Sequence, residues 1–195
     1  MQQINFPTGA QEILNRYFNA LGVLEFILFQ VDQNKSSLKD FHRVAAMNGL
    51  NSLMKRENTE RCWGPDNSSF LTQIELNLRE GNEVFVQSFM GDSFDAKTQL
   101  FNESSEVSEG FAFAFLNPPY SLKVSGGAVG AEHELFLNFL KEVLSGPEAG
   151  AKMFSWNTES SSYFDAGREW WGCFFWTLEI PSLSRIIVIV GSSTD

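Results

Sequence analysis

The sequence predicts an α+β protein: a single domain over residues 1–195, with a mainly antiparallel sheet and helices packed on one side of it. Two β-prone runs near the C-terminal end, residues 170–180 and 186–190, flank a turn-prone connector and indicate an antiparallel hairpin. Other strands follow one another through short turns, which is typical of antiparallel sheets. The 19 phenylalanines and five tryptophans indicate an aromatic core, since each buried ring removes roughly 150–250 Å² from water.

The C-terminal aromatic hairpin is expected at the centre of the sheet. One face of its first run carries large apolar side chains: Trp170, Phe174, Trp176, Leu178 and Ile180. The other face begins with apolar residues and becomes polar at Thr177 and Glu179. Residues 186–190 are apolar on both faces, which predicts that the sheet is covered on both sides over that length.

The remaining elements follow from the spacing of apolar residues and from the turn signals between them. The expected helices are residues 10–21, a segment from about residue 38 that Gly49 bends or ends, and residues 131–145. The expected strands are residues 70–78 and 84–90, which form a hairpin, and residues 111–116 and 154–156. Residues 24–31 fit either a strand or a continuation of the first helix, and a strand is preferred.

The composition narrows the classes of partner. A formal net charge of −10 argues against binding to nucleic acid or to an anionic membrane surface, because both need a basic patch. No apolar run approaches the ~20 residues that span a membrane. Two cysteines, Cys62 and Cys173, and a first segment unlike a signal peptide predict a cytoplasmic protein.

Residues 91–110 form a polar, acidic stretch that we expect to be a loop between two strands of one sheet. It carries five carboxylates against the single Lys97: Asp92, Asp95, Glu103, Glu106 and Glu109. Their irregular spacing does not fit a calcium loop. The stretch is either a solvated connection or a surface for a basic partner, with Glu103, Glu106 and Glu109 as candidate binding residues.

A second candidate site lies where the aromatic hairpin begins. Asp165, Arg168, Glu169 and Trp171 come close together in the sequence there. Arg168 offers a planar donor fork to a carboxylate or phosphate, and Trp171 offers a ring for stacking on a ligand. The alternative is a salt-bridged start of a strand, with the tryptophans in the core.

The motif Asn117-Pro-Pro-Tyr120, placed after an apolar segment, resembles the motif of DNA and RNA amino-methyltransferases. In that family the Asn side chain and a backbone carbonyl accept hydrogen bonds from the target amino group, and the Tyr stacks on the base. The glycine-rich residues 125–130, which open a helix, are similar to an S-adenosylmethionine loop. The resemblance implies catalytic roles for Asn117 and Tyr120.

The pattern as a whole predicts a non-catalytic protein-binding or regulatory module, of the kind seen in inhibitor or immunity proteins. Its acidic surface would suit a basic protein partner. The two histidines, His42 and His133, lack the spacing of a metal site, and no cofactor or metal is expected. An S-adenosylmethionine-dependent amino-methyltransferase-like enzyme is the alternative, and the antiparallel order and acidic charge make it the less favoured one.

Overall fold

A six-stranded antiparallel sheet forms the middle layer of the molecule. The computed structural model describes residues 1–31, 38–60, 81–101, 109–125, 129–146, 151–165, 167–168 and 171–193. The strands are β1 (Gln2–Ile4), β2 (Glu25–Gln30), β3 (Gly81–Val84), β6 (Met153–Trp156), β7 (Cys173–Ile180) and β8 (Arg185–Ser192). Their order in the sheet is β1-β2-β8-β7-β6-β3, and every neighbouring pair is antiparallel.

The aromatic hairpin lies at the centre of this sheet, as the sequence predicted. Strands β7 and β8 occupy the two middle positions and pair from Cys173 opposite Ser192 to Ile180 opposite Arg185. A short 3-10 turn, η3 (Pro181–Leu183), connects them. Strand β2, the preferred interpretation of residues 24–31, pairs along the other side of β8. The predicted α+β class and the mainly antiparallel sheet are therefore confirmed.

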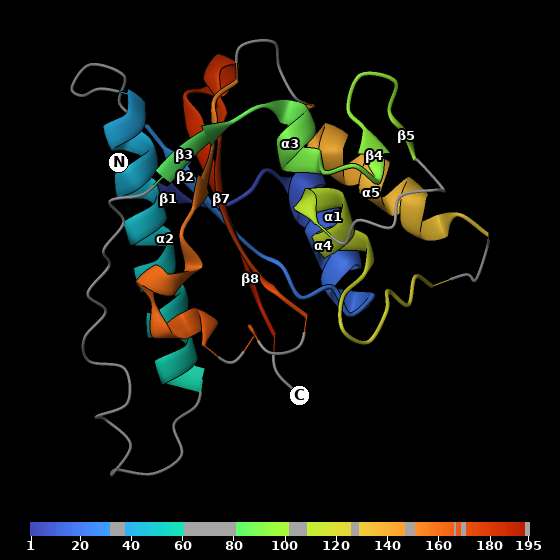
Figure 1. Ribbon diagram of the computed structural model, residues 1–195, viewed down its shortest axis with the longest axis horizontal. Helices are drawn as coiled ribbons and strands as arrows, with labels where there is room; N and C mark the ends of the chain where they lie inside the picture. The colour runs from blue at the N-terminus through green and yellow to red at the C-terminus, as the bar shows by residue number, and fades with distance from the viewer. Residues whose placement is uncertain are drawn as a thin grey trace.

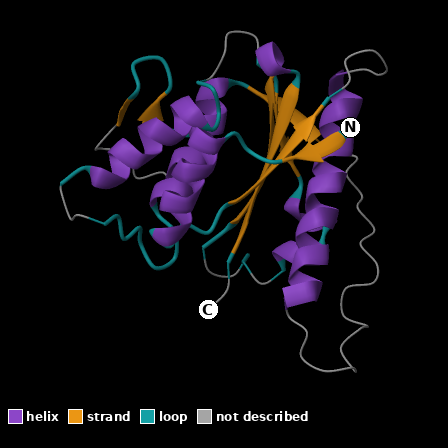
Figure 2. Ribbon diagram, turned by 180° about the vertical axis from the view of Figure 1, so that it is seen from behind, coloured by secondary structure: helices purple, strands orange, loops and turns teal. Residues whose placement is uncertain are grey.

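Helices cover both faces of the sheet (Figures 1 and 2). The helices on the first face are α1 (Thr8–Asn19), α3 (Val86–Met90), α4 (Gly110–Leu116) and α5 (Ala131–Glu142). Helix α2 (Leu38–Glu60) lies against β7 and β8 on the opposite face. The predicted grouping on one side thus holds for four helices, whereas α2 provides the second cover that the apolar residues 186–190 require.

Alternate residues of the central strands serve two separate cores. Trp176, Leu178 and Ile180 of β7 point into the core beneath α1, α3, α4 and α5, together with Ile187 and Ile189 of β8. The residues between them belong to the core beneath α2, which includes Phe154, Trp156, Phe175, Val188 and Val190. Among the described residues, no helix is long and apolar enough to cross a membrane.

Two segments predicted as strands are helical. Residues 111–116 belong to α4, where Phe111 and Phe115 lie four residues apart and are both fully buried. Within residues 84–90, strand β3 ends at Val84, and the rest of the segment forms helix α3. The buried side chains of α3 are Phe89 and Met90. The acidic stretch therefore connects two helices rather than two strands. The predicted strand 70–78 lies outside the described residues.

Gly49 does not end its helix, since α2 continues to Glu60. A Cβ at Gly49 would lie 2.8 Å from Cγ1 of Val188, well inside the usual contact distance. The glycine therefore permits the backbone of α2 to approach β8 closely.

Candidate functional site

The acidic excursion, residues 92–109, leaves the core at the end of α3 and returns to it at the start of α4. Its base is closed by Gly91 and Gly110, each with a φ of +83°. A Cβ at Gly110 would lie 2.5 Å from Cα of Gly91, and a Cβ at Gly91 would lie 2.3 Å from the carbonyl oxygen of Glu109. Only glycine fits such a crossing, because the two backbones touch and both residues have a left-handed φ. The two ends of the acidic excursion are thereby held together.

Gln87 of α3 holds the first half of the acidic excursion in place. Its Nε2 donates to the carbonyls of Gly91 and Phe94 at 2.9 and 2.8 Å, and its Oε1 accepts from the Ala96 N–H at 3.0 Å. The carboxylate of Asp95 accepts from the backbone N–H groups of Thr98 and Lys97 at 2.9 and 2.8 Å. These bonds lower the pKa of Asp95, the one to Thr98 most, and keep it ionised.

Residues 94–101 of the excursion form a small hairpin that packs on α5. Strand β4 (Phe94–Asp95) pairs with β5 (Leu100–Phe101). The Phe94 and Phe101 rings lie 5.2 and 5.7 Å from the Phe136 ring, and the Phe101 ring stacks on His133 at 3.9 Å. These contacts place the hairpin beside the first turn of α5.

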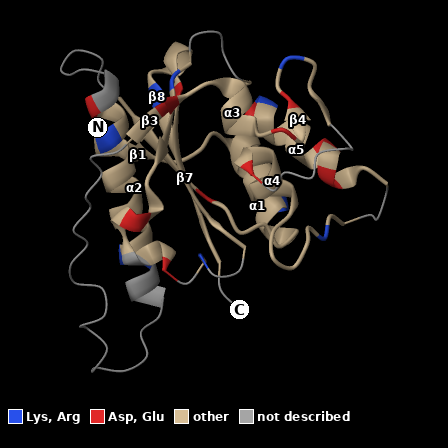
Figure 3. Cartoon of the chain, viewed as in Figure 1, with Lys and Arg blue, Asp and Glu red and all other residues tan. Residues whose placement is uncertain are grey.

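The acidic charges of two distant segments consequently meet at one end of the molecule (Figure 3). We call this surface the acidic end and define it by five carboxylates: Asp92, Asp95, Glu109, Glu132 and Glu134. Lys97 is the one lysine or arginine within residues 92–101, 109 and 131–134. Two apolar side chains are exposed on the same elements, Leu100 at 65% and Val129 completely. Glu103 and Glu106 lie outside the described residues, and Glu109 is exposed at the start of α4.

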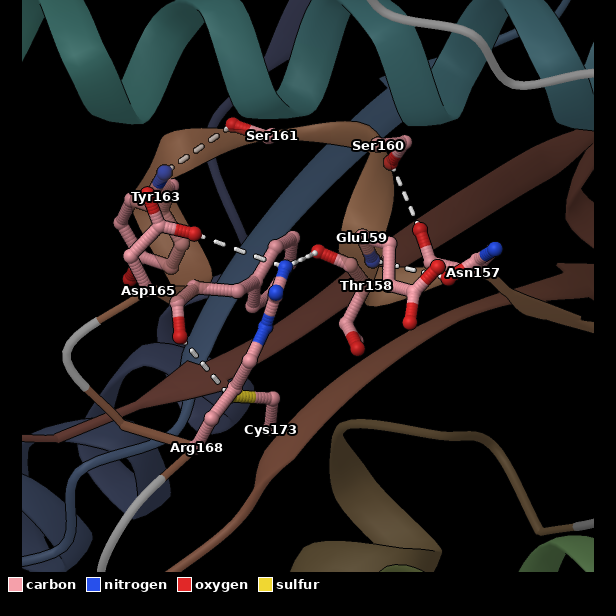
Figure 4. A network of polar contacts seen from close by, with 10 residues as sticks. Asn157, Thr158, Glu159, Ser160, Ser161, Tyr163, Asp165, Arg168 and Cys173 are labelled. Atoms are coloured by element: carbon pink, nitrogen blue, oxygen red, sulfur yellow. Dashed lines mark hydrogen bonds and ion pairs between the residues drawn. The ribbon is translucent and has the colours of Figure 1, made fainter.

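The second predicted site is engaged in holding its own loop. Arg168 donates to the carbonyl of Thr158 at 2.8 Å, and its guanidinium lies 3.5 Å from the carboxylate of Asp165 (Figure 4). Glu169 lies outside the described residues. The geometry matches the salt-bridged start of a strand rather than a free donor fork.

The polar groups around Arg168 also serve the backbone. Asn157 accepts from the Glu159 N–H at 2.8 Å and so begins η1 (Thr158–Ser160), and Ser161 accepts from the Tyr163 N–H at 3.1 Å at the start of η2 (Ser162–Phe164). The Cys173 thiol donates to the Phe164 carbonyl at 3.1 Å. Burial raises the pKa of this thiol, which opposes formation of a thiolate nucleophile.

The methyltransferase-like motif follows a helix, not the strand that the resemblance requires. Asn117 ends α4, its side-chain amide donates to the Phe113 carbonyl at 3.4 Å, and its own carbonyl accepts from the Trp171 indole at 2.6 Å. Tyr120 is exposed. The Trp171 bond joins two predicted sites, but α4 separates them from the acidic excursion, which meets the opposite end of that helix.

The two histidines lie in different environments. His133 is exposed on α5, whereas His42 is fully buried between α2 and the sheet, 2.8 Å from Oγ1 of Thr177. Within the described ranges, no three His, Cys, Asp or Glu side chains gather as a metal site would require. Burial of His42 could not be predicted from the sequence, because Thr177 was expected on a polar strand face.

Comparisons with protein-family models, curated proteins and solved structures found no match to this chain. A function must therefore be argued from the geometry of the chain itself.

Proposed function

We propose that the protein is a non-catalytic binding module that docks a basic protein partner through its acidic end. The observation that carries the proposal is a group of five carboxylates, against one lysine, on three connected elements. These are the β4–β5 hairpin, the first turn of α5 beside it, and the start of α4, whose backbone touches the base of the hairpin. The overall charge of −10 acts in the same direction. Such a field accelerates encounter with a basic surface and is weakened by salt.

The acidic end also carries the apolar side chains that a protein interface needs. Leu100 projects from β5, and Val129 precedes α5, so both stand beside the carboxylates. Protein interfaces combine apolar contacts at their centre with charged residues at the rim. A basic partner with a shallow apolar patch would therefore complement this surface, as a nuclease complements an acidic inhibitor or immunity protein.

Contacts at the base of the excursion hold the β4–β5 hairpin in one conformation. The Gly91–Gly110 crossing and the three hydrogen bonds of Gln87 fix the hairpin before any partner arrives. A fixed surface loses less conformational freedom on binding, which favours affinity. We place the encounter in the cytoplasm, since a chain with two cysteines suits a reducing compartment.

The experiment compares the protein with two triple variants of equal charge. The first removes charge from the acidic end by Glu109→Gln, Glu132→Gln and Glu134→Gln. Each bait captures proteins from a cell lysate at low and at high salt, and association rates are then measured with each captured protein. We expect the first variant to lose basic proteins that the unchanged chain captures only at low salt.

The matched control carries Glu12→Gln, Glu142→Gln and Glu159→Gln, all at exposed positions elsewhere. It has the same net charge as the first variant, so it should retain capture if the acidic end is the binding surface. Equal capture by all three baits, or no capture by any, would contradict the proposal. A further variant with Glu103→Gln and Glu106→Gln extends the test along the excursion.

A further inference from the structure

A row of side chains runs across the sheet beneath α2. Cross-strand pairing places Glu83, Phe154, Thr177, Val188 and Ile27 side by side, one from each of five strands. Neighbours in such a row share one face, and its apolar members belong to the core that α2 covers. The middle of this row is therefore closed to solvent, and Thr177 is fully buried.

His42 projects from α2 onto the middle of that row. It is completely buried, its Nδ1 lies 2.8 Å from Oγ1 of Thr177, and its ring lies 4.5 Å from the Phe154 ring. The indole of Trp156 donates to the same Thr177 oxygen at 2.9 Å. A buried chain of hydrogen bonds thus joins β6, β7 and α2.

This chain has a direction. An indole N–H can only donate a hydrogen bond, so the Thr177 hydroxyl oxygen accepts from Trp156. The Thr177 hydroxyl can then donate its own proton in one further hydrogen bond. Donation to Nδ1 of His42 satisfies both groups and requires that nitrogen to be unprotonated. The other ring nitrogen, Nε2, is buried and has no hydrogen-bond partner among the described residues.

Protonation of His42 conflicts with this arrangement. Nδ1 would become a donor, so the Thr177 hydroxyl would have to turn its proton towards an apolar core. A positive charge would also be enclosed among apolar side chains, whereas the Nε2 proton has no partner among the described residues before or after protonation. Each change costs free energy, because buried polar groups without partners and buried charges are unfavourable.

Helix α2 is also held by small side chains. Its buried contacts include Ala45, Ala46 and Gly49, which remove little apolar surface from water. Leu50, Leu53 and Met54 are its larger buried side chains among the described positions, and Phe41 and Met47 are half-buried against the same core. The docking of α2 therefore combines these contacts with a close backbone approach and with the polar pair of His42 and Thr177.

We propose that α2 is released from the sheet on mild acidification, and that protonation of His42 is the trigger. The first face of the sheet, with its four helices, remains folded in this step. Its buried core contains aromatic and aliphatic side chains, none of which titrates in this range.

The charged groups around the His42 imidazole do not offset the free-energy cost of protonating it in the docked state. Burial lowers the pKa of His42 to about 4, and the charge of Glu83 opposes that shift only in part. Glu83 is itself paired with Lys152, which also acts on Glu179 on the same face of β7. Asp40 and Arg43, the charged neighbours on α2, are exposed to solvent.

The size of the effect follows from proton linkage. An undocked His42 has the ordinary pKa of about 6.5, so the undocked state binds more protons between that pH and about 4. Between pH 7 and pH 5 the undocking equilibrium should rise by roughly 20-fold.

Hydrogen–deuterium exchange on the full-length chain tests this inference, with rates corrected for the intrinsic effect of pH. We expect protection in α2 to fall by roughly 20-fold from pH 7 to pH 5 and to lie below the protection of α1 and α5 at both pH values, because α2 opens without them. Asparagine offers an acceptor near the position of Nδ1 and does not titrate, so His42→Asn should abolish the pH effect. The matched control, His133→Asn on the exposed face of α5, should retain it.

Constant protection of α2 over this range would overturn the proposal. Equal protection of α2, α1 and α5 at each pH would also overturn it, since the helices would then open together by global unfolding. A pH effect that persists in His42→Asn would also overturn it. If that variant does not fold, NMR titration of the unchanged chain decides: the docked His42 ring must stay neutral at pH 5. A resonance that titrates near pH 6.5 with α2 still docked would refute the mechanism.

Discussion

The two faces of the central sheet are covered in opposite ways. On the first face, four helices contribute a network of rings in mutual contact: Tyr17, Phe89, Phe111, Phe115, Phe136 and Phe139. On the second face, the single helix α2 meets the sheet through small and aliphatic residues, with Phe41, Met47 and Met54 as its other apolar side chains. The same two strands, β7 and β8, supply both faces, because side chains alternate along a strand. The covering helices, not the strands, therefore create the difference.

The contrast indicates which part of the fold responds to its surroundings. Buried rings stabilise the first face through apolar area alone, which does not depend on pH. The second face has less apolar area and includes a hydrogen-bonded chain that requires a neutral imidazole. We therefore expect large core truncations to matter most on the first face, and protons and close contacts to matter most on the second.

The largest effect is expected on the first face. Phe139 is fully buried and contacts Tyr17, Phe26, Phe111 and Phe115. Phe139→Ala should lower the free energy of unfolding by about 3–5 kcal/mol, measured by urea denaturation.

The control for that variant is Phe85→Ala, whose ring is 84% exposed. It should change the free energy of unfolding by less than about 0.5 kcal/mol. Similar losses in the two variants would show that the aromatic network is not the main support of the first face.

The next effect is expected in the polar chain of the second face. Thr177→Val keeps the side-chain shape but leaves Trp156 Nε1 and His42 Nδ1 without a partner. Each of the two unsatisfied buried groups costs about 1–3 kcal/mol, and the added buried methyl group of valine offsets about 1 kcal/mol, so the variant should lose about 1–5 kcal/mol in urea denaturation. Thr8→Val, at an exposed position, is the control. A loss as small as the control's would mean that the hydrogen-bonded chain contributes little to α2 docking.

Much of this architecture could be predicted from patterns that are long or unambiguous. Residues 186–190 are apolar on both faces, which required a central strand with two covers. The stripes of α1 and α5 have helical spacing over three turns, so both helices were found with nearly correct bounds.

The wrong predictions concern short segments whose spacing of apolar residues fits both a strand and a helix. The sequence Phe-Ala-Phe-Ala-Phe of residues 111–115 alternates like a strand, yet positions 111 and 115 also share a helical face. Six residues cannot separate the two periods, and the tertiary packing of α4 against α5 and α3 decides. The sequence predicts a bend or an end of the helix at Gly49, because the close approach to Val188 cannot be seen in the sequence.

The candidate site was predicted only in part. The acidic character of residues 92–109 is local and was visible in the sequence. The addition of Glu132 and Glu134 depends on the contact between Phe101 and His133, two residues far apart in the chain. For the same reason, the Arg168 loop was expected to be as plausible a binding site as the excursion, until its bond to Thr158 placed it in a structural role.

A smaller effect is expected when pH changes. The pKa of His42 is lowered to about 4 in the folded state, below its ordinary value of 6.5, so its contribution to stability is complete above about pH 6.5. That contribution falls as pH decreases towards 4, because the unfolded chain then binds a proton that the folded chain does not. The free energy of unfolding should drop by about 2 kcal/mol between pH 7 and pH 5.

Urea denaturation at several pH values measures this slope, with Phe139→Leu as a variant that perturbs only the first face. The slope should be the same in that variant and in the unchanged chain, because the proton acts on the second face. A different slope would mean that the two faces are coupled through the sheet and that the contrast between them is weaker than proposed.

The smallest effect concerns the approach of α2 to β8. In Gly49→Ala the new Cβ would lie 2.8 Å from Cγ1 of Val188, whose branched side chain is buried and has few rotamers. Overpacking of this kind costs about 1–3 kcal/mol, whereas alanine favours a helix over glycine by about 1 kcal/mol. The net loss should therefore be about 1 kcal/mol in urea denaturation. The double variant with Val188→Ala provides space for the methyl group, so the two changes together should cost less than the sum of their separate costs. Additive losses would show that α2 already stands away from β8, and the close approach would then not distinguish the second face from the first.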